Sequence, residues 1–459
     1  MYHIYSINYK KEGQVINTFT FDVTFYPGKK KRMIVPQQYY KHFHSINTID
    51  YGPYKTTVEC LAHQKNNHTI YISSPLKSTI NLSSNKQLSL YVHGNTCVIP
   101  LTFGVFLAGF QKDQFPLGNR TKLFEQMSKA GEKLGFQTIF FGYQHVLQNK
   151  RKINGFYFQH NEWKRDIFDF PTVVYNRIPN RKIEHHPEVM QVMEIIRLEA
   201  TIFNDSFFNK WEIYDNLMKN PSCSYLLPDT ILHPSKQKVM QLLTHHPIYI
   251  KPIHGSRGDG IVKCQKLSTG EIECHFYQND KPKINRYTDE ESLFTQLFPN
   301  GLKGYVVQEE IPLLKKGKSA IDFRVHTNKN HKNSWEVTLI GAKFAGKGSL
   351  TTHVQRGGSI HVVEELFPKS QADRMTSKLA KTAVHLANAI EKSIFHPIGE
   401  IGFDLGMDQE GKVWLFEANA KPGFSIFDHP RLEIKASEVF SHLYKYAFYL
   451  HNMRLNKAL

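Results

Sequence analysis

Two apolar segments near the C-terminus are joined by a short polar run, and both segments carry acidic side chains that are costly to bury alone. The segments are Ile401–Met407 and Lys412–Asn419, and the four polar residues between them end in Gly411. A short polar run that ends in glycine is typical of a hairpin turn between two strands. The sequence therefore predicts a β-hairpin whose carboxylates need partners.

The register of this hairpin decides which side chains meet. We expect Met407 to pair with Lys412 across the turn. In that register, the alternation of side chains along a strand puts Asp404, Glu417 and Asn419 on one face. Carboxylate and amide oxygens are ligands that Mg²⁺ prefers, with substrate phosphates completing its octahedron. A metal site is therefore predicted here, and the alternative is a hairpin whose carboxylates face water.

A second motif combines a strand lysine with a glycine-rich loop. The short apolar stretch Tyr249–Pro252 contains Lys251, and three glycines follow within residues 255–260. Glycines let backbone N–H groups turn towards a phosphate, and the lysine adds a point charge. The loop lacks the Gly-Lys-Ser/Thr ending of a Walker A motif, and Lys263 stands where a dinucleotide-binding motif has its third glycine. The pattern indicates a phosphate grip of another type, with an ordinary glycine-rich turn as the alternative.

The length and the patterning predict a mixed α/β fold with three regions. A chain of 459 residues is long enough for several domains. Alternating hydrophobic residues favour a small β-rich domain over residues 1–100. Strand, helix and strand follow one another in residues 101–204, as expected of a parallel α/β unit. Residues 205–459 contain helices and strands in mixed order together with both motifs.

Individual elements are predicted where the hydrophobic period is clear. The expected strands are 18–25, 71–72, 88–92, 104–109, 137–141 and 171–175, and the expected helices are 119–134 and 439–449.

The charge balance bears on partners and location. The chain has 58 Lys and Arg against 41 Asp and Glu, and this net charge of +17 attracts polyanions such as nucleotides, nucleic acid or an acidic polymer. No known nucleic-acid-binding motif accompanies the charge, so nucleic acid is not expected as a partner. No long apolar run and no signal peptide is found, which predicts a cytoplasmic protein without a membrane span. The five scattered cysteines predict free thiols.

Several short motifs occur in an order that resembles the ATP-grasp superfamily. They are Asn209-Lys210, Leu227-Pro228-Asp229-Thr230, Lys251 with its glycine loop, Val307-Gln308-Glu309-Glu310-Ile311, Asp322-Phe323-Arg324, Asp404, Glu417-Ala418-Asn419 and Pro422-Gly423. The resemblance covers about residues 205–450 and is to the YheC/YheD-type endospore coat-associated group of spore-forming bacteria in particular. It implies an ATP-grasp fold, preceded by the α/β domain that such enzymes commonly carry.

The resemblance also implies roles for the matching positions. The ATP-binding residues would be Lys210, Lys251, Gly255, Ser256, Arg257, Gly258, Gly260, Gln308, Glu309, Glu310 and Ile311. In this set the lysines would hold the phosphates, the glycine loop would be a lid, and residues 308–311 would form the hinge that meets adenine and, through one of its two glutamates, ribose. Arg324 and Arg356 would be catalytic residues that face the transferred phosphate and the acyl phosphate. The Mg²⁺ ligands would be the three hairpin residues, Asp404, Glu417 and Asn419.

The implied reaction is the activation of a carboxylate by ATP and Mg²⁺ as an acyl phosphate, which an amine then attacks. The carboxylate and amine substrates are unknown, with a peptide or an acidic polymer of the spore surface both open. Peptide-ligase relatives often have asparagine where this chain has Thr352-His353, which leaves the acceptor pocket undefined. The alternative is an ATP-binding structural or assembly protein of the spore coat that has lost turnover, and production of ADP would separate the two.

Overall fold

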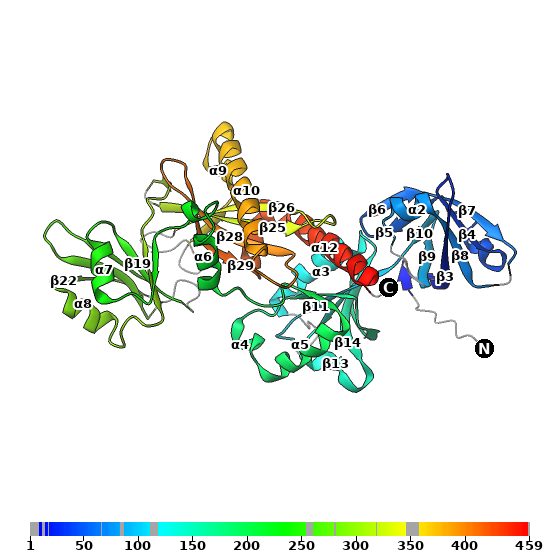
Figure 1. The fold of residues 1–459 in the computed structure, drawn as a ribbon, viewed down its shortest axis with the longest axis horizontal. Coiled ribbons are helices and arrows are strands. Elements are labelled where there is room, and N and C mark those ends of the chain that lie inside the picture. Colours follow the sequence, from blue (N-terminus) through cyan, green and yellow to red (C-terminus); the bar gives the residue numbers. More distant parts are fainter. Residues whose placement is uncertain are drawn as a thin grey trace.

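The computed structural model describes residues 9–11, 14–16, 18–65, 67–82, 87–110, 118–253, 260–279, 281–317, 319–345 and 358–457. The chain is elongated and contains four large sheets, each with its own short connections and helices (Figure 1). The N-terminal sheet lies at one end of the molecule and the sheet formed by residues 230–309 lies at the other. This arrangement confirms the predicted mixed α/β fold. In the described residues, no helix is long and apolar enough to cross a membrane.

The N-terminal sheet is mixed and has the strand order β6-β5-β10-β9-β3-β8-β4-β7. Its strands are β3 (Thr18–Tyr26), β4 (Arg32–Pro36), β5 (Thr48–Tyr51), β6 (Tyr54–Thr57), β7 (Glu59–His63), β8 (Thr69–Ser73), β9 (Gln87–His93) and β10 (Thr96–Val98). The smaller elements are β1 (Tyr9–Lys11), β2 (Gln14–Ile16), α1 (Tyr40–Phe43) and α2 (Ser74–Thr79). The strands predicted at 18–25, 71–72 and 88–92 are confirmed.

The second sheet has the order β13-β14-β12-β11-β16-β17, with β15 beyond β14. Its strands are β11 (Leu101–Phe106), β12 (Phe136–Phe141), β13 (Val146–Leu147), β14 (Lys152–Gln159), β15 (Glu162–Asp169), β16 (Val173–Asn176) and β17 (Thr201–Phe203). Its helices are α3 (Thr121–Glu132), α4 (Arg181–Glu184) and α5 (Pro187–Glu199). The predicted strands and helix of this region are confirmed, although the strand predicted at 104–109 begins and ends three residues earlier.

The middle of this second sheet is parallel, as predicted. Strand β11 pairs in parallel with β12 on one side and with β16 on the other, and β16 pairs in parallel with β17. The strands that follow β11 in the chain are thus added on both of its sides, β12 on one and β16 on the other. The boundary between β11 and β16 is therefore a topological switch point. In open α/β sheets the crevice outside the carboxyl ends of the strands at such a point is a frequent ligand site.

The third sheet is antiparallel, with the order β18-β23-β19-β20-β21-β22. Its strands are β18 (Thr230–Leu232), β19 (Ile248–Pro252), β20 (Val262–Lys266), β21 (Ile272–Gln278), β22 (Lys281–Tyr287) and β23 (Tyr305–Glu309). Helices α7 (Lys236–Leu243) and α8 (Glu290–Leu297) share a core with Ile248 and Ile250. Because side chains alternate along β19, Lys251 lies on the face that these helices leave uncovered.

The fourth sheet carries the acidic hairpin and has the order β27-β26-β25-β28-β29. Its strands are β24 (Lys315–Lys316), β25 (Ser319–Lys329), β26 (Trp335–Phe344), β27 (Ser359–His361), β28 (Glu400–Met407) and β29 (Val413–Asn419). The accompanying helices are α6 (Lys210–Met218), α9 (Val363–Leu366) and α10 (Lys369–Glu391). Phe323 and Val325 of β25 pack in one core with α10, so Asp322 and Arg324 point to the opposite face.

The last helix, α12 (Ala436–Lys457), follows α11 (Pro430–Glu433) and crosses from the fourth sheet back to the first two (Figure 1). The hydroxyl of Tyr444 lies 2.6 Å from the hydroxyl of Thr138 in β12. Phe448 packs edge-on against Tyr51 of the N-terminal sheet, with ring centroids 4.8 Å apart. The predicted C-terminal helix is confirmed, and it packs the end of the chain against the first and second sheets.

Candidate functional site

The turn of the acidic hairpin is longer than the sequence suggested. Met407 pairs with Val413, so the predicted pairing of Met407 with Lys412 is wrong. The extra residue is absorbed by a closed turn, in which the N–H of Asp408 donates to the carbonyl of Lys412 at 3.0 Å. The side chain of Asp408 also accepts from the N–H groups of Glu410 and Lys412. These bonds satisfy backbone donors inside the turn, which explains why Lys412 belongs to the turn and not to the strand.

A β-bulge then restores the shared face of the predicted ligands. Leu405 pairs with Leu415, and both side chains lie in the hydrophobic core. Between Leu405 and Asp404 the register shifts, so Asp404 lies opposite Glu417, whereas the predicted pairing of Met407 with Lys412 would put it opposite Leu415. The amide nitrogen of Asn419 lies 3.5 Å from a carboxylate oxygen of Asp404. The three residues share one face because of a bulge that strand alternation alone does not reveal.

Asp404 is buried and is surrounded by cations from two neighbouring strands. Arg324 of β25 binds it in a bidentate manner, with both N···O distances 3.0 Å. The ammonium of Lys343 in β26 lies 2.7 Å from Asp404 and 3.1 Å from Asp322. Burial alone would raise the pKa of Asp404, but the charges and hydrogen bonds of Arg324 and Lys343 outweigh burial and hold this pKa well below its usual range. The carboxylate is therefore ionised at any working pH.

Glu417 has a looser partner from the start of helix α6. The ammonium of Lys210 lies 3.1 Å from the carboxylate of Glu417, and the two side chains are 32% and 31% exposed. The side chain of Asn209 caps α6 by accepting from the N–H groups of the next turn, which fixes where the helix begins. An ion pair with this exposure contributes little to stability, about 0 to 1 kcal/mol. The pair can open at small cost.

Lys251 of the third sheet is held within its own sheet but feels the charges of groups outside it. Its ammonium donates to the side-chain oxygen of Gln308 at 2.6 Å. Burial, opposed by the charge of Glu417 and assisted by the charge of Lys210, lowers the pKa of Lys251 to about 8. In the described part of the chain, no carboxylate lies within ion-pair distance of this ammonium. Lys251 is therefore a half-buried cation held by a neutral amide, and the charges of Lys210 and Glu417 act on it.

Strand β23 contains the first residues of the predicted hinge, and the hinge ends in a buried residue. Gln308 accepts from Lys251 and donates from its amide nitrogen to the hydroxyl of Thr230 at 2.9 Å. This network fixes the orientation of the amide, so that its oxygen faces the ammonium. Ile311, the last residue of the hinge motif, is 8% exposed.

Both hinge glutamates, either of which was predicted to reach a ribose, have partners of their own. Glu309 accepts the backbone N–H of Asp229 at 2.9 Å. Glu310 forms an ion pair of 2.6 Å with Lys263 of β20, and both side chains are partly exposed. Burial, followed by the charge of Glu310, raises the pKa of Tyr249 well above its usual range. Which of the two glutamates would reach the ribose stays open. Glu310 is held by a side chain and Glu309 by a backbone N–H group.

Several predicted site residues lie outside the described residues. They are Gly255, Ser256, Arg257, Gly258 and Arg356, together with His353. Gly260 is described and has a positive φ of 72°, and a Cβ atom built on it would lie 3.1 Å from Pro252. This conformation is unfavourable for any other residue.

Two partners of the site were missed by sequence reasoning. Lys343 and Lys263 were not predicted, although each forms an ion pair with a residue of a predicted motif. Lys343 stands in the apolar strand β26, where a charged residue needs a partner. That signal indicates burial with a counter-charge but not which carboxylate provides it.

The donor atoms at the hairpin fit a hard divalent cation. Within the described residues, no group of three or more His, Cys, Asp and Glu side chains could hold a metal ion. The predicted set consists of two carboxylates and one amide, all oxygen donors of the kind that Mg²⁺ uses alongside water and phosphate. Asp404 is already ionised, and Glu417 needs only to leave a partly exposed lysine. The ion pairs of the ligand-free protein are thus compatible with a metal that arrives with phosphates.

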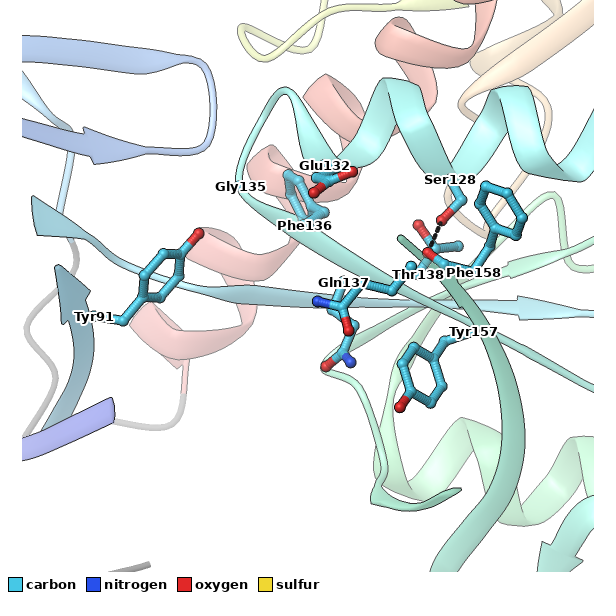
Figure 2. A pocket seen from close by; sticks show the side chains of 10 residues that line it. Tyr91, Ser128, Glu132, Gly135, Phe136, Gln137, Thr138, Tyr157 and Phe158 are labelled. Atoms are coloured by element: carbon cyan, nitrogen blue, oxygen red, sulfur yellow. Dashed lines mark hydrogen bonds between the residues drawn. The ribbon is translucent and has the colours of Figure 1, made fainter. Parts of the chain in front are cut away.

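A shallow hollow lies elsewhere, over the second sheet (Figure 2). Its lining residues are Tyr91, Ser128, Glu132, Gly135, Phe136, Gln137, Thr138, Tyr157, Phe158 and Gln159. Phe140 of β12 pairs with Phe156 of β14, and the hollow is lined by the residues of β12 before this pair and of β14 after it. None of the predicted nucleotide or metal residues lines it, so the hollow is distinct from the cation cluster.

The chain is similar to known proteins in sequence and in fold. The family described as YheC/D-like ATP-grasp matches residues 199–450. The endospore coat-associated protein YheD of Bacillus subtilis (strain 168) is 34% identical over 391 residues, which are 83% of this chain and 86% of that protein. The endospore coat-associated protein YheC of the same organism is 19% identical over 267 residues, 57% of this chain and 73% of that protein. Among solved structures, the VanG D-Ala:D-Ser ligase from Enterococcus faecalis has a TM-score of 0.44 and 11% identity, covering 76% of this chain and 99% of that chain.

Proposed function

The chain belongs to the YheC/YheD-like ATP-grasp family, and from this premise we propose that it is an ATP- and Mg²⁺-dependent ligase that joins a carboxylate to an amine. The observation that carries the proposal is the partly buried ammonium of Lys251, which donates to a neutral amide, has no carboxylate partner among the described residues, and lies in the electrostatic field of Lys210 and Glu417. A buried cation without a counter-charge is unfavourable unless a ligand supplies one. A nucleotide phosphate would supply it.

The charge of the whole cluster supports a polyphosphate ligand. Among the described side chains, four cations face three carboxylates, which leaves one positive charge. The cations come from the third sheet, the fourth sheet and helix α6, so a ligand that contacts all of them would bridge the two sheets. Lys210 and Lys251 would bind and orient the phosphates, and the hinge at residues 308–311 would receive the base.

Three residues of the hairpin would hold Mg²⁺. They are Asp404, Glu417 and Asn419, which share a face in the bulged hairpin. The metal would neutralise charge that develops on the phosphate oxygens. Arg324 and Lys343 keep Asp404 ionised, and Lys210 can move from Glu417 towards the phosphates, which frees that carboxylate. A neighbouring cation therefore sets the charge of Asp404 and the freedom of Glu417.

The reaction follows from what these residues can bind. Arg324 would face the terminal phosphoryl group as it moves from ATP to a carboxylate oxygen, which yields ADP and an acyl phosphate. The nitrogen of an amine would then form a bond to the acyl carbon, the phosphate would leave with the electrons of its C–O bond, and the amine would lose a proton. Both steps use positioned positive charge, and neither needs a nucleophilic side chain of the protein.

We further propose an association with the endospore coat, because both curated relatives carry that description in their names. Those names state an association and no reaction. An ATP-binding assembly protein of the coat that has lost turnover is therefore the second candidate. A peptide or an acidic polymer of the spore surface would suit either role.

The test is an ADP-release screen in the presence of Mg·ATP over amino acids, peptides and cell-wall fragments. Hydroxylamine is added in a parallel series, because it captures an acyl phosphate as a hydroxamate and so reports activation when the natural amine is absent. The matched control is Glu417→Gln. Substrate-dependent ADP release that this variant lacks supports the ligase. Binding of Mg·ATP without release in any mixture favours the assembly protein, and failure of the wild type to bind Mg·ATP contradicts both.

A further inference from the structure

Two arginines meet at the switch point of the second sheet. Arg177 directly follows strand β16, and its backbone N–H donates to the carbonyl of Phe106, the last residue of β11. Arg120 directly precedes helix α3 and donates from its guanidinium to the carbonyl of Ala108 at 2.7 Å. Both side chains thus belong to the crevice outside the carboxyl ends of β11 and β16, where ligands of open α/β sheets commonly bind.

Aromatic rings hold the two guanidinium groups in place. Arg177 lies 4.0 Å over the ring of Phe424 and donates to the carbonyl of Pro422. Arg120 lies 5.6 Å from the ring centroid of Phe124. The two phenylalanine rings are themselves in edge-to-face contact, with centroids 6.4 Å apart. The guanidinium groups therefore lie beside two phenylalanine rings that form an apolar floor, and one of these rings belongs to the segment that follows β29.

The positive charge of the two guanidinium groups is opposed by one buried carboxylate, Glu400, whose charge acts on Arg177. Arg177 is 8% exposed and Arg120 is half-buried. Burial, and then the charge of Arg177, lowers the pKa of Arg120. Glu184 and Asp205 form ion pairs at 2.6 and 3.0 Å, whereas Glu400 accepts a hydrogen bond at 3.1 Å from a neutral hydroxyl, which does not neutralise its charge. The three partners are, in that order, Lys421, Arg197 and Tyr175. Within the described residues, no carboxylate forms an ion pair with either guanidinium. Two partly buried cations without an ion-pair partner favour binding of an anionic ligand.

We propose that Arg120 and Arg177 form a subsite for a carboxylate of the substrate, separate from the carboxylate that is activated. This inference rests on the proposed function, because it names the substrate class of the same site. His326 lies two residues beyond Arg324 on the same face of β25, and the charges of both Arg324 and Arg177 act on it. The subsite therefore adjoins the expected position of phosphoryl transfer. A substrate that reaches both places carries two carboxylates joined by an aliphatic stem, which the phenylalanine floor accommodates.

The experiment measures binding of glutarate, with acetate as the monocarboxylate control, by calorimetry at fixed ionic strength and without nucleotide. Arg120→Gln keeps polar character but removes the charge, so glutarate binding should weaken about tenfold, the effect of losing one charge-assisted contact. Arg120→Lys should recover part of the affinity. The matched control, Arg151→Gln, removes an exposed arginine that pairs with Glu199 and should bind glutarate as the wild type does. Binding of Mg·ATP is measured on every variant and should not change.

The outcomes separate this inference from the proposed function. Glutarate that binds the wild type no better than acetate, or equally well to wild type and Arg120→Gln, would overturn the subsite while leaving the ATP results intact. Selective loss of glutarate binding in Arg120→Gln with unchanged melting temperature supports it. If Arg120→Gln loses stability, the charge-preserving Arg120→Lys decides, because a purely structural arginine would not give recovery of glutarate affinity. A wild type that binds glutarate but not Mg·ATP would support the subsite and contradict the ligase.

Discussion

Replacement of Lys251 by methionine should make the ligand-free protein more stable and the nucleotide site weaker. The pKa of Lys251 falls from an ordinary 10.5 to about 8 in the folded protein, mainly because the ammonium is buried. Each pKa unit corresponds to about 1.4 kcal/mol, so keeping this group charged costs the folded state about 3 kcal/mol at neutral pH. Lys251→Met removes that cost. It also leaves the oxygen of Gln308 without its donor, which lowers the free energy of unfolding by about 1 to 2 kcal/mol.

The expected net effect is therefore a gain of about 1 to 2 kcal/mol in the free energy of unfolding at pH 7. The sign depends on pH. The unfolded chain keeps the proton of Lys251 up to about pH 10.5 and the folded chain only up to about pH 8. The wild type therefore carries the full cost below pH 8 and loses it progressively as the pH rises to 10.5. The advantage of Lys251→Met should shrink over that window.

Calorimetry at pH 7 and pH 9.5 measures the stability, and titration with Mg·ATP measures the affinity. Lys251→Met should bind Mg·ATP more weakly by about 1.5 to 3 kcal/mol, the value of a hydrogen bond to a charged group. Lys210→Met is the matched control, because its ammonium is 32% exposed and paired, and its loss should bring no gain in stability. A less stable Lys251→Met protein would show that the ammonium is a structural partner. Unchanged affinity would show that it does not face the phosphates.

Three further changes test neighbouring parts of the site. Glu417→Gln should keep the melting temperature of the ligand-free protein, because its ion pair is partly exposed, yet abolish turnover and most of the Mg²⁺ dependence of the ATP-induced thermal shift; a full Mg²⁺-dependent shift would refute the metal assignment. Gly260→Val should lose ATP protection in the same thermal assay, since φ is 72° and Pro252 lies close, and wild-type protection would mean an ordinary turn. Lys343→Met should lower the free energy of unfolding by about 3 to 5 kcal/mol in a denaturant titration, because it leaves two carboxylates with less counter-charge; a loss below about 1 kcal/mol would mean that Arg324 alone satisfies them.

The elements of the fold could be predicted because their hydrophobic patterns are local. Residues 18–25 alternate, and the strand β3 (Thr18–Tyr26) results; residues 119–134 repeat with the helical period, and α3 (Thr121–Glu132) results. The hairpin was predicted for the same reason, since its turn residues are adjacent in sequence. Its register was not, because the bulge at Asp404 depends on how β29 packs against the core and on the neighbouring strand.

The partners of the site residues could not be predicted from the sequence. Lys343 lies 61 residues before Asp404, and only the order β26-β25-β28 brings the two together. Lys251 looks like any strand lysine until the third sheet buries it beside Gln308. The motifs indicated which residue types could bind a nucleotide. The structure adds which of them already neutralise one another and which are left without a counter-charge.

The carboxylates that the sequence predicts as metal ligands act as counter-ions in the ligand-free protein, and one electrostatic cause would explain both roles. A site that must hold a triphosphate and Mg²⁺ needs cations and carboxylates side by side, and before the ligand arrives they can only pair with each other. Asp404 is held by two buried cations and should stay in place when a nucleotide binds. Glu417 is held by one partly exposed lysine, so it is the carboxylate that can exchange partners. Lys210 would then move to a phosphate as Mg²⁺ takes its position beside Glu417, which predicts that Lys210→Met weakens ATP binding without raising the Mg²⁺ concentration needed for half-maximal binding. Titration of Mg²⁺ at fixed ATP measures that concentration, and a rise in Lys210→Met as large as that in Glu417→Gln would refute the exchange.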